Sequence, residues 1–92
     1  MIVAFKCRDT EALFNGKRVA RFAKIETTAM RKLAMINVAG KIEDLRVPPG
    51  NRLEALSGKR KGQWSIRIND QWRICFRFDD GNALDVEIVD YH

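Results

Sequence analysis

Four residues in this chain could together cut RNA without a metal ion. Such cleavage needs a base that takes the proton from the ribose 2′-hydroxyl and an acid that protonates the leaving 5′-oxygen. It also needs a cation that holds the charge gathering on the phosphate. Glu54, Arg73 and His92 are candidates for the base, the cation and the acid. The phenol of Tyr91 could stack on a base or steady the phosphate.

The proposed base and cation also have ordinary structural explanations. Glu54 is the only acid between Asp44 and Asp70, and nearby cations would keep it ionised as a weak base. A glutamate in such surroundings is also typical of a surface salt bridge. Arg73 lies between two apolar residues whose burial would hold its backbone rigid, which suits a guanidinium fixed over a phosphate. An exposed strand arginine without a task has the same neighbours.

His92 is the only histidine and the last residue printed. An imidazole can titrate near neutral pH, and a terminal carboxylate beside it would favour the protonated form that donates to a leaving oxygen. The alternative is a frayed tail. Because the strand pattern continues through Val89, we expect Tyr91 to be held by the sheet, with His92 one residue further.

The positive charge is concentrated in one segment. The chain has a net charge of +5, and residues 50–77 hold seven bases and two acids, while all other residues hold ten of each. Such a segment attracts polyanions, nucleic acid above all, although a solvated face kept for solubility has the same composition. Besides Arg73, its basic residues are Arg52, Lys59, Arg60, Lys61, Arg67 and Arg77, which we expect to bind RNA.

Length and composition restrict the other classes. We expect one domain over 1–92, because 92 residues leave no room for a second core. No apolar run approaches the roughly 18 residues of a membrane span, and the first residues do not resemble a signal peptide. Cys7 and Cys75 form no Cys-x-x-Cys pair, and with one histidine the chain lacks zinc ligands. We therefore expect a cytoplasmic protein with reduced thiols, no membrane contact, no metal and no cofactor.

Short helices are predicted in the N-terminal half. We expect Thr10 to cap a helix over 11–14 that ends at Gly16, and apolar spacing indicates a second short piece over 19–25. A longer helix is predicted from about 28 to 38. Its apolar stripe is expected to consist of Met30, Leu33, Ala34 and Asn37.

After the Pro-Pro-Gly-Asn break at 48–51, apolar and polar residues alternate. The alternation predicts a three-stranded antiparallel meander with turns at 69–70 and 80–81. Short strands over 2–5 and 53–56 are expected to join it. The predicted fold class is α+β, with N-terminal helices packed on one face of a twisted antiparallel sheet. The apolar side, expected beneath the helices, consists of Trp64, Ile66, Ile68, Trp72, Ile74, Phe76, Phe78, Leu84, Val86 and Ile88.

The same alternation places cations on the other side of the sheet. Side chains two residues apart on a strand point to the same face, so Arg67, Arg73 and Arg77 should face away from the helices. If the third strand starts near Ala83, Tyr91 falls on that face too. The sequence therefore predicts a cationic, concave surface with a phenol at its rim.

Three stretches also resemble a known family. They are Leu-Glu-Ala-Leu-Ser-Gly at 53–58, the Trp-Ser-Ile-Arg-Ile-Asn-Asp-Gln-Trp-Arg run within 62–74, and the ending Asp90-Tyr91-His92. Together they resemble the HigB (plasmid maintenance killer) toxins of the RelE/ParE superfamily. The likeness covers essentially the whole chain.

The resemblance implies a RelE-like fold and a toxin of a type II toxin-antitoxin system. It implies cleavage of messenger RNA threaded in the ribosomal decoding site, which inhibits translation. It implies a HigA-like helix-turn-helix antitoxin as partner, and operator DNA bound only through that antitoxin.

Family roles carry over onto the matching residues. Arg73 would stabilise the transition state, His92 would be the acid, and Tyr91 and Asp90 would complete the catalytic ending. Some HigB toxins have a histidine where this chain has Glu54, whereas the related YoeB-like branch has a glutamate there as general base.

Two other functions fit parts of the sequence. A ParE-like inhibitor of DNA gyrase belongs to the same superfamily and would be toxic without cutting RNA. A non-catalytic RNA-binding module would share the basic sheet and would not need His92.

Overall fold

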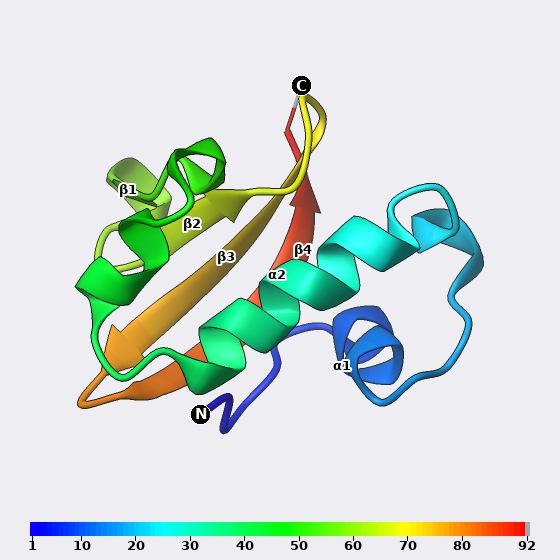
Figure 1. Ribbon diagram of the computed structural model, residues 1–92, viewed down its shortest axis with the longest axis horizontal. Coiled ribbons are helices and arrows are strands. Elements are labelled where there is room, and N and C mark those ends of the chain that lie inside the picture. Colours follow the sequence, from blue (N-terminus) through cyan, green and yellow to red (C-terminus); the bar gives the residue numbers. More distant parts are fainter. Residues whose placement is uncertain (92) are drawn as a thin grey trace.

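The computed structural model describes residues 1–91 and shows a four-stranded antiparallel sheet with two α-helices packed against it (Figure 1). Helix α1 spans Arg8–Phe14 and helix α2 spans Glu26–Val38. Both precede the sheet in the chain, and α2 crosses the front of the sheet in Figure 1. The predicted α+β class, with N-terminal helices on one face of an antiparallel sheet, is confirmed.

The strands follow one another along the chain in the order β1-β2-β3-β4. Each pairs antiparallel with the next, as short connections require. The longest connection in the sheet is the one between the two-residue strand β1 and β2. The strand bounds are β1 Glu54–Ala55, β2 Trp64–Arg67, β3 Trp72–Asp79 and β4 Asn82–Asp90.

The hydrophobic core lies between α2 and one face of this sheet. Ile74 of β3 pairs with Ile66 and Ile88 on its two neighbours, and all three side chains are buried. Leu33 and Ile36 from α2 belong to the same cluster and are fully buried. Burial of each such side chain stabilises the fold by about 1.5–3 kcal/mol, so this apolar face packs the sheet against helix α2.

Residues 2–5 join the sheet less regularly than predicted. They run parallel to β4 and make two isolated bridges, Ile2 to Ala83 and Phe5 to Val86, and form no regular strand. The amide of Ile2 donates instead to Asn37 Oδ1 on α2, at 2.9 Å. The chain start is therefore tied to both layers.

Two predictions about the helices are wrong. Helix α1 begins at Arg8, so Thr10 lies inside it, and the Thr10 hydroxyl accepts a hydrogen bond from the Ile88 amide at 3.0 Å. A buried tertiary partner thus outweighs the capping preference. On α2, Ala34 is exposed and the buried stripe runs one residue earlier. The buried α2 residues are Ala29, Lys32, Leu33 and Ile36.

Leu84 was expected on the apolar face and is on the other one. Asp85 adopts a left-handed conformation, with φ of 52°, and the pairing of β3 with β4 shifts register there. The extra residue of this bulge reverses the alternation. Ala83 is therefore buried beneath the helices, while Leu84 pairs with Arg77.

Within residues 1–91 no helix is long and apolar enough to cross a membrane. The same residues hold no group of three or more His, Cys, Asp or Glu side chains that could bind a metal ion.

Candidate active site

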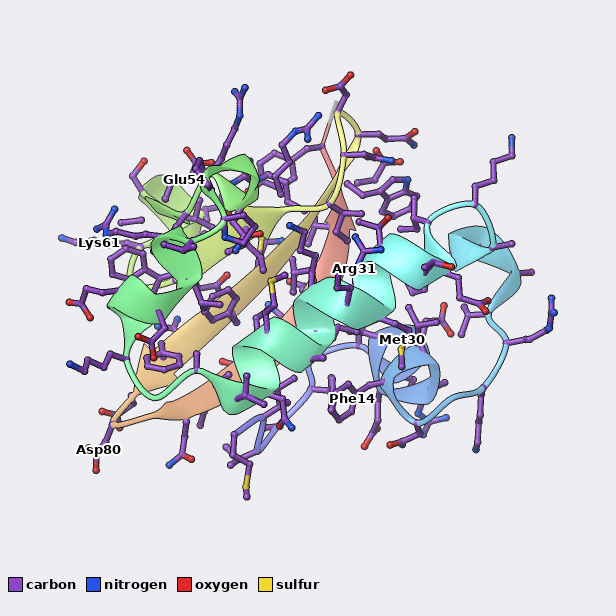
Figure 2. All side chains as sticks on the ribbon, in the orientation of Figure 1. Phe14, Met30, Arg31, Glu54, Lys61 and Asp80 are labelled. Carbon is purple, nitrogen blue, oxygen red and sulfur yellow. The ribbon has the colours of Figure 1, made fainter. Side chains whose placement is uncertain are left out.

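The face of the sheet opposite the helices carries a cluster of polar residues, called here the polar face. Glu54 of β1 pairs with Ser65 of β2, and Ser65 pairs with Cys75 of β3. Paired residues share a face, so these three side chains and the diagonal neighbour Arg73 lie together. The polar face is defined by Glu54, Ser65, Arg73, Cys75, Glu87 and Tyr91. Figure 2 shows Glu54 on the β1 side of the sheet, away from Met30 and Arg31 on α2.

Arg73 is the most firmly held side chain of the polar face. Its Nε donates to Ser65 Oγ at 2.8 Å, and its Nη2 donates to the Arg52 carbonyl at 2.7 Å. Glu54 Oε1 lies 3.5 Å from the same Nη2. The Arg73 side chain is only 12% exposed, whereas that of Glu54 is 54% exposed. The guanidinium is therefore preorganised, and the carboxylate next to it is open to solvent.

A turn before β1 brings the Arg52 carbonyl to this position. Pro48 and Pro49 lead into a short 3-10 helix, Pro49–Asn51, and Arg52 then adopts a left-handed conformation with φ of 45°. This conformation turns the chain sharply into β1. The turn is what places the carbonyl of Arg52 and the carboxylate of Glu54 on one side of Arg73.

Tyr91 closes the other side of Arg73. The Arg73 guanidinium carbon lies 5.9 Å from the centre of the Tyr91 ring, within the range of a cation–π contact. The Tyr91 hydroxyl lies 3.7 Å from Cys75 Sγ. Burial raises the pKa values of both the Tyr91 phenol and the Cys75 thiol, so both groups are neutral at physiological pH. The prediction that Tyr91 shares a face with Arg73 is confirmed.

The predicted RNA-binding residues fall into two groups. Arg60, Arg67 and Arg77 are paired within the chain. Arg60 Nη1 donates to Glu87 at 2.9 Å, which raises the pKa of Arg60, while Arg67 pairs with Asp70 and Arg77 with Asp85 at 3.3 Å. The other three residues are exposed. Lys59 and Lys61 lie in the connection between β1 and β2, and Arg52 lies just before β1. Figure 2 shows Lys61 near the same edge of the sheet as Glu54.

The two remaining predicted residues are not part of the cluster as described. Asp90 pairs with Trp72, which places it on the opposite face of β4 from Tyr91, and its carboxylate accepts from Gln71 Nε2 at 3.2 Å. His92 lies outside the described residues. The structure thus brings together Glu54, Arg73 and Tyr91 and leaves Asp90 at the tip of the sheet.

Three residues of the polar face carried no functional signal in the sequence. Ser65 and Cys75 are fully buried although they face away from the helices, because Arg73 and Tyr91 cover them. Glu87 anchors Arg60 across the sheet. Only the strand register reveals that these side chains support Arg73, Tyr91 and Arg60.

The arrangement can stabilise a negatively charged phosphate next to an acceptor for a proton. The fixed Arg73 guanidinium presents donors to phosphate oxygens without needing to reorganise. The exposed Glu54 carboxylate lies within reach of any group bound there. Within the described residues the cluster thus combines a fixed cation, Arg73, with a candidate base, Glu54.

Comparisons with known proteins agree on one family. Residues 11–92 match the family described as RelE-like toxin of type II toxin-antitoxin system HigB. The chain is 41% identical over 86 residues to Toxin HigB-1 of Vibrio cholerae. This match covers 91% of this chain and 90% of the relative. It is also 44% identical over 41 residues, 45% of each chain, to Endoribonuclease HigB of Proteus vulgaris.

Among solved structures, the fold is similar to that of a YoeB-YefM complex from Staphylococcus aureus. The TM-score is 0.57 at 20% sequence identity, and the match covers 100% of this chain and 98% of that chain. A heterotetrameric YoeB-YefM toxin-antitoxin complex from the same organism gives a TM-score of 0.57 at 15% identity, with the same coverage. At these identities the similarity concerns the fold.

Proposed function

This chain belongs to the HigB-like family of RelE-like toxins, and from that membership we propose that it is an endoribonuclease that cuts messenger RNA on the ribosome. One relative is named an endoribonuclease. The observation that carries the proposal is the fixed Arg73 guanidinium with Glu54 Oε1 3.5 Å from its Nη2, on the face that the helices leave uncovered.

The proposed reaction uses the ribose of the message as the nucleophile. Glu54 takes the proton from the 2′-hydroxyl as that oxygen attacks the adjacent phosphorus, and the bond to the 5′-oxygen breaks. Arg73 binds the equatorial phosphate oxygens as charge gathers there. His92 gives a proton to the 5′-oxygen, which leaves a cyclic phosphate on one fragment and a 5′-hydroxyl on the other.

The supporting residues have smaller proposed roles. Tyr91 holds Arg73 from the far side and stacks on a base or steadies the phosphate, and Asp90 orients the C-terminal end through Gln71. Arg52, Lys59 and Lys61 contact the RNA backbone, with weaker contributions from Arg60, Arg67 and Arg77, whose guanidinium groups already have carboxylate partners. Binding through such contacts falls steeply with salt.

The ribosome is the proposed source of orientation. The Glu54 carboxylate is 54% exposed to solvent, and a chain of 92 residues offers few groups to read bases. A decoding site that holds the message extended, with the 2′-oxygen in line with the leaving oxygen, supplies geometry that this site lacks. Proposed partners are therefore the ribosome with its message and a HigA-like antitoxin, which alone contacts operator DNA. All of these partners place the proposed activity in the cytoplasm.

The test is to map the 5′ ends of cellular messages after the chain is induced. Wild-type chain is expected to produce new 5′-hydroxyl ends within translated regions, whereas Arg73→Ala and His92→Gln chains are expected to produce none. Messages that remain intact in growth-arrested cells, together with an SOS response, would instead show a gyrase inhibitor.

A further inference from the structure

We propose that Lys32 and Asn51, two buried polar residues outside the polar face, are positioning residues that hold Arg73 and Glu54 in their reactive arrangement. The inference rests on the proposed cleavage reaction. It concerns the support of the site and assigns neither residue a contact with RNA.

Lys32 is a lysine on the buried stripe of α2, with only 8% of its surface exposed. Burial lowers the pKa of Lys32, and the nearby charges of Arg31 and Arg67 lower it further. A buried ammonium is costly unless it has a partner. Lys32 Nζ donates to Asn51 Oδ1, in the turn that precedes β1.

Asn51 is fully buried and connects three parts of the chain. Its Oδ1 accepts from Lys32, and its Nδ2 donates to the carbonyls of Leu45 at 3.1 Å and Val47 at 3.5 Å. One side chain therefore fixes the turn to helix α2 and to the segment before the two prolines. Within residues 1–91 Lys32 is the only donor to Oδ1, so it fixes one end of this amide while the two carbonyls fix the other.

The next residue along the chain reaches the site directly. The Arg52 carbonyl accepts from Arg73 Nη2 at 2.7 Å, and Glu54 follows two residues later at 3.5 Å from the same nitrogen. A shift of the Asn51 turn therefore moves the carbonyl and the carboxylate together relative to Arg73. Displacements of about 1 Å at reacting groups can lower rates by about 100-fold.

The experiment compares Lys32→Met, Lys32→Gln and the control Lys17→Met in the full chain. Met keeps the length of the side chain without a donor, and Gln keeps an N–H donor. Lys17 is exposed and outside the polar face, so its replacement makes the same change in charge. Single-turnover cleavage of a message bound in the decoding site is measured together with its half-saturating toxin concentration. The Arg73 Nε–H resonance is followed by NMR in the protein alone, and it is assigned by its loss in Arg73→Lys.

We expect Lys32→Met to lower the bound cleavage rate about 10- to 100-fold with a nearly unchanged half-saturating concentration. Lys32→Gln should recover part of the rate, and Lys17→Met should match wild type. The Arg73 resonance should shift or broaden in Lys32→Met, and it should stay at its wild-type position in Lys17→Met.

A merely structural role gives a different result. The melting temperature would then fall, while the rate per folded molecule and the Arg73 resonance would stay at wild-type values, and the proposal would be overturned. If wild-type chain cuts no RNA, the proposed function fails, yet the Arg73 resonance still decides whether Lys32 positions the guanidinium. An unmoved resonance in folded Lys32→Met overturns the inference in that case too.

Discussion

The two faces of strand β3 are equally well buried at their centre and are held together by different forces. Ile74 and Phe76 point under the helices and are fully buried among aliphatic and aromatic neighbours. Cys75, between them, points the other way and is also fully buried, beneath the Tyr91 phenol. Arg73, one position before Ile74, is 12% exposed and makes directed hydrogen bonds to Ser65 and Arg52.

This difference separates stability from chemistry along a single strand. Apolar burial is non-directional and is shared by many contacts, so the helix-covered face sets how stable the sheet is. Hydrogen bonds to a guanidinium depend on direction, so the polar face sets where one charged group sits. Neighbouring substitutions on β3 should therefore affect different measurements.

The largest effect is expected from Arg73→Ala. Removing the cation that faces the phosphate should lower the cleavage rate by about 1000-fold, comparable to the loss of a transition-state donor in other enzymes. The free energy of unfolding should fall by about 1–2 kcal/mol, because the hydrogen bonds to Ser65 and Arg52 are lost while the apolar core beneath the helices stays intact. Cleavage of ribosome-bound message and thermal unfolding measure the two quantities. Arg18→Ala, at an exposed position, is the control for charge. Full cleavage by Arg73→Ala would remove the polar face from the mechanism.

Ile74→Ala should show the reverse pattern. Its side chain is fully buried between Ile66 and Ile88, so truncation should lower the free energy of unfolding by about 3 kcal/mol through lost burial and a cavity. The cleavage rate per folded molecule should stay close to that of wild type. Denaturant titration and an activity assay well below the unfolding transition give both values. A large loss of rate without loss of stability would show that the two faces are not independent.

Glu54→Gln should have a smaller effect on the rate than Arg73→Ala. The amide keeps the shape of the carboxylate and cannot accept the 2′-proton, so the rate should fall about 100-fold. Single-turnover cleavage of ribosome-bound message measures this loss. The control is Glu43→Gln, an exposed glutamate whose loss changes the charge equally. A wild-type cleavage rate in Glu54→Gln would show that Glu54 serves only to hold Arg73.

The sheet was the most predictable part of the fold, because the two-residue alternation from Trp64 onward is regular and its turns contain Asn-Asp and Asp-Gly. The alternation failed at Leu84, where the bulge at Asp85 inserts one residue. The local sequence does not predict that bulge, because Asp adopts a left-handed conformation less readily than Gly does. On α2 the amphipathic pattern is weak, and the buried stripe was predicted one residue too late. A lysine such as Lys32 is expected at the surface, although here it is buried.

The site was predictable only where chemistry and alternation agreed. Arg73 and Tyr91 fall on one face by counting residues along β3 and β4, and Glu54 was a candidate because it is the only acid between Asp44 and Asp70. Asp90 was predicted from the family resemblance, yet the same counting places it on the opposite face of β4. Asn51 could not be found, because a Pro-Pro-Gly-Asn run indicates a turn and does not indicate what the turn holds in place.

The smallest predicted effect concerns the two thiols and the pH dependence of stability. Burial raises the pKa of Cys75 above its ordinary value of 9.0, so the folded chain keeps its proton when the unfolded chain loses it. Stability from this group is complete below about pH 9 and falls as pH rises above that value, by at most about 1.4 kcal/mol per pH unit. Cys75→Ala should therefore reduce the loss of stability between about pH 8 and pH 10, measured by urea unfolding.

Cys7 is the matched control with the opposite sign. Burial raises its pKa, but hydrogen bonds from Thr10 and Asp9 and the nearby Arg21 outweigh burial, so the pKa is lowered overall. The folded chain therefore releases the Cys7 proton at lower pH than the unfolded chain does, which adds stability as pH rises through the folded value. Cys7→Ala should make the alkaline loss steeper where Cys75→Ala makes it shallower. If the free energy of unfolding fell equally steeply with pH in both variants, Cys75 would not be shielded from water. The centre of the polar face would then differ from the helix-covered face in burial.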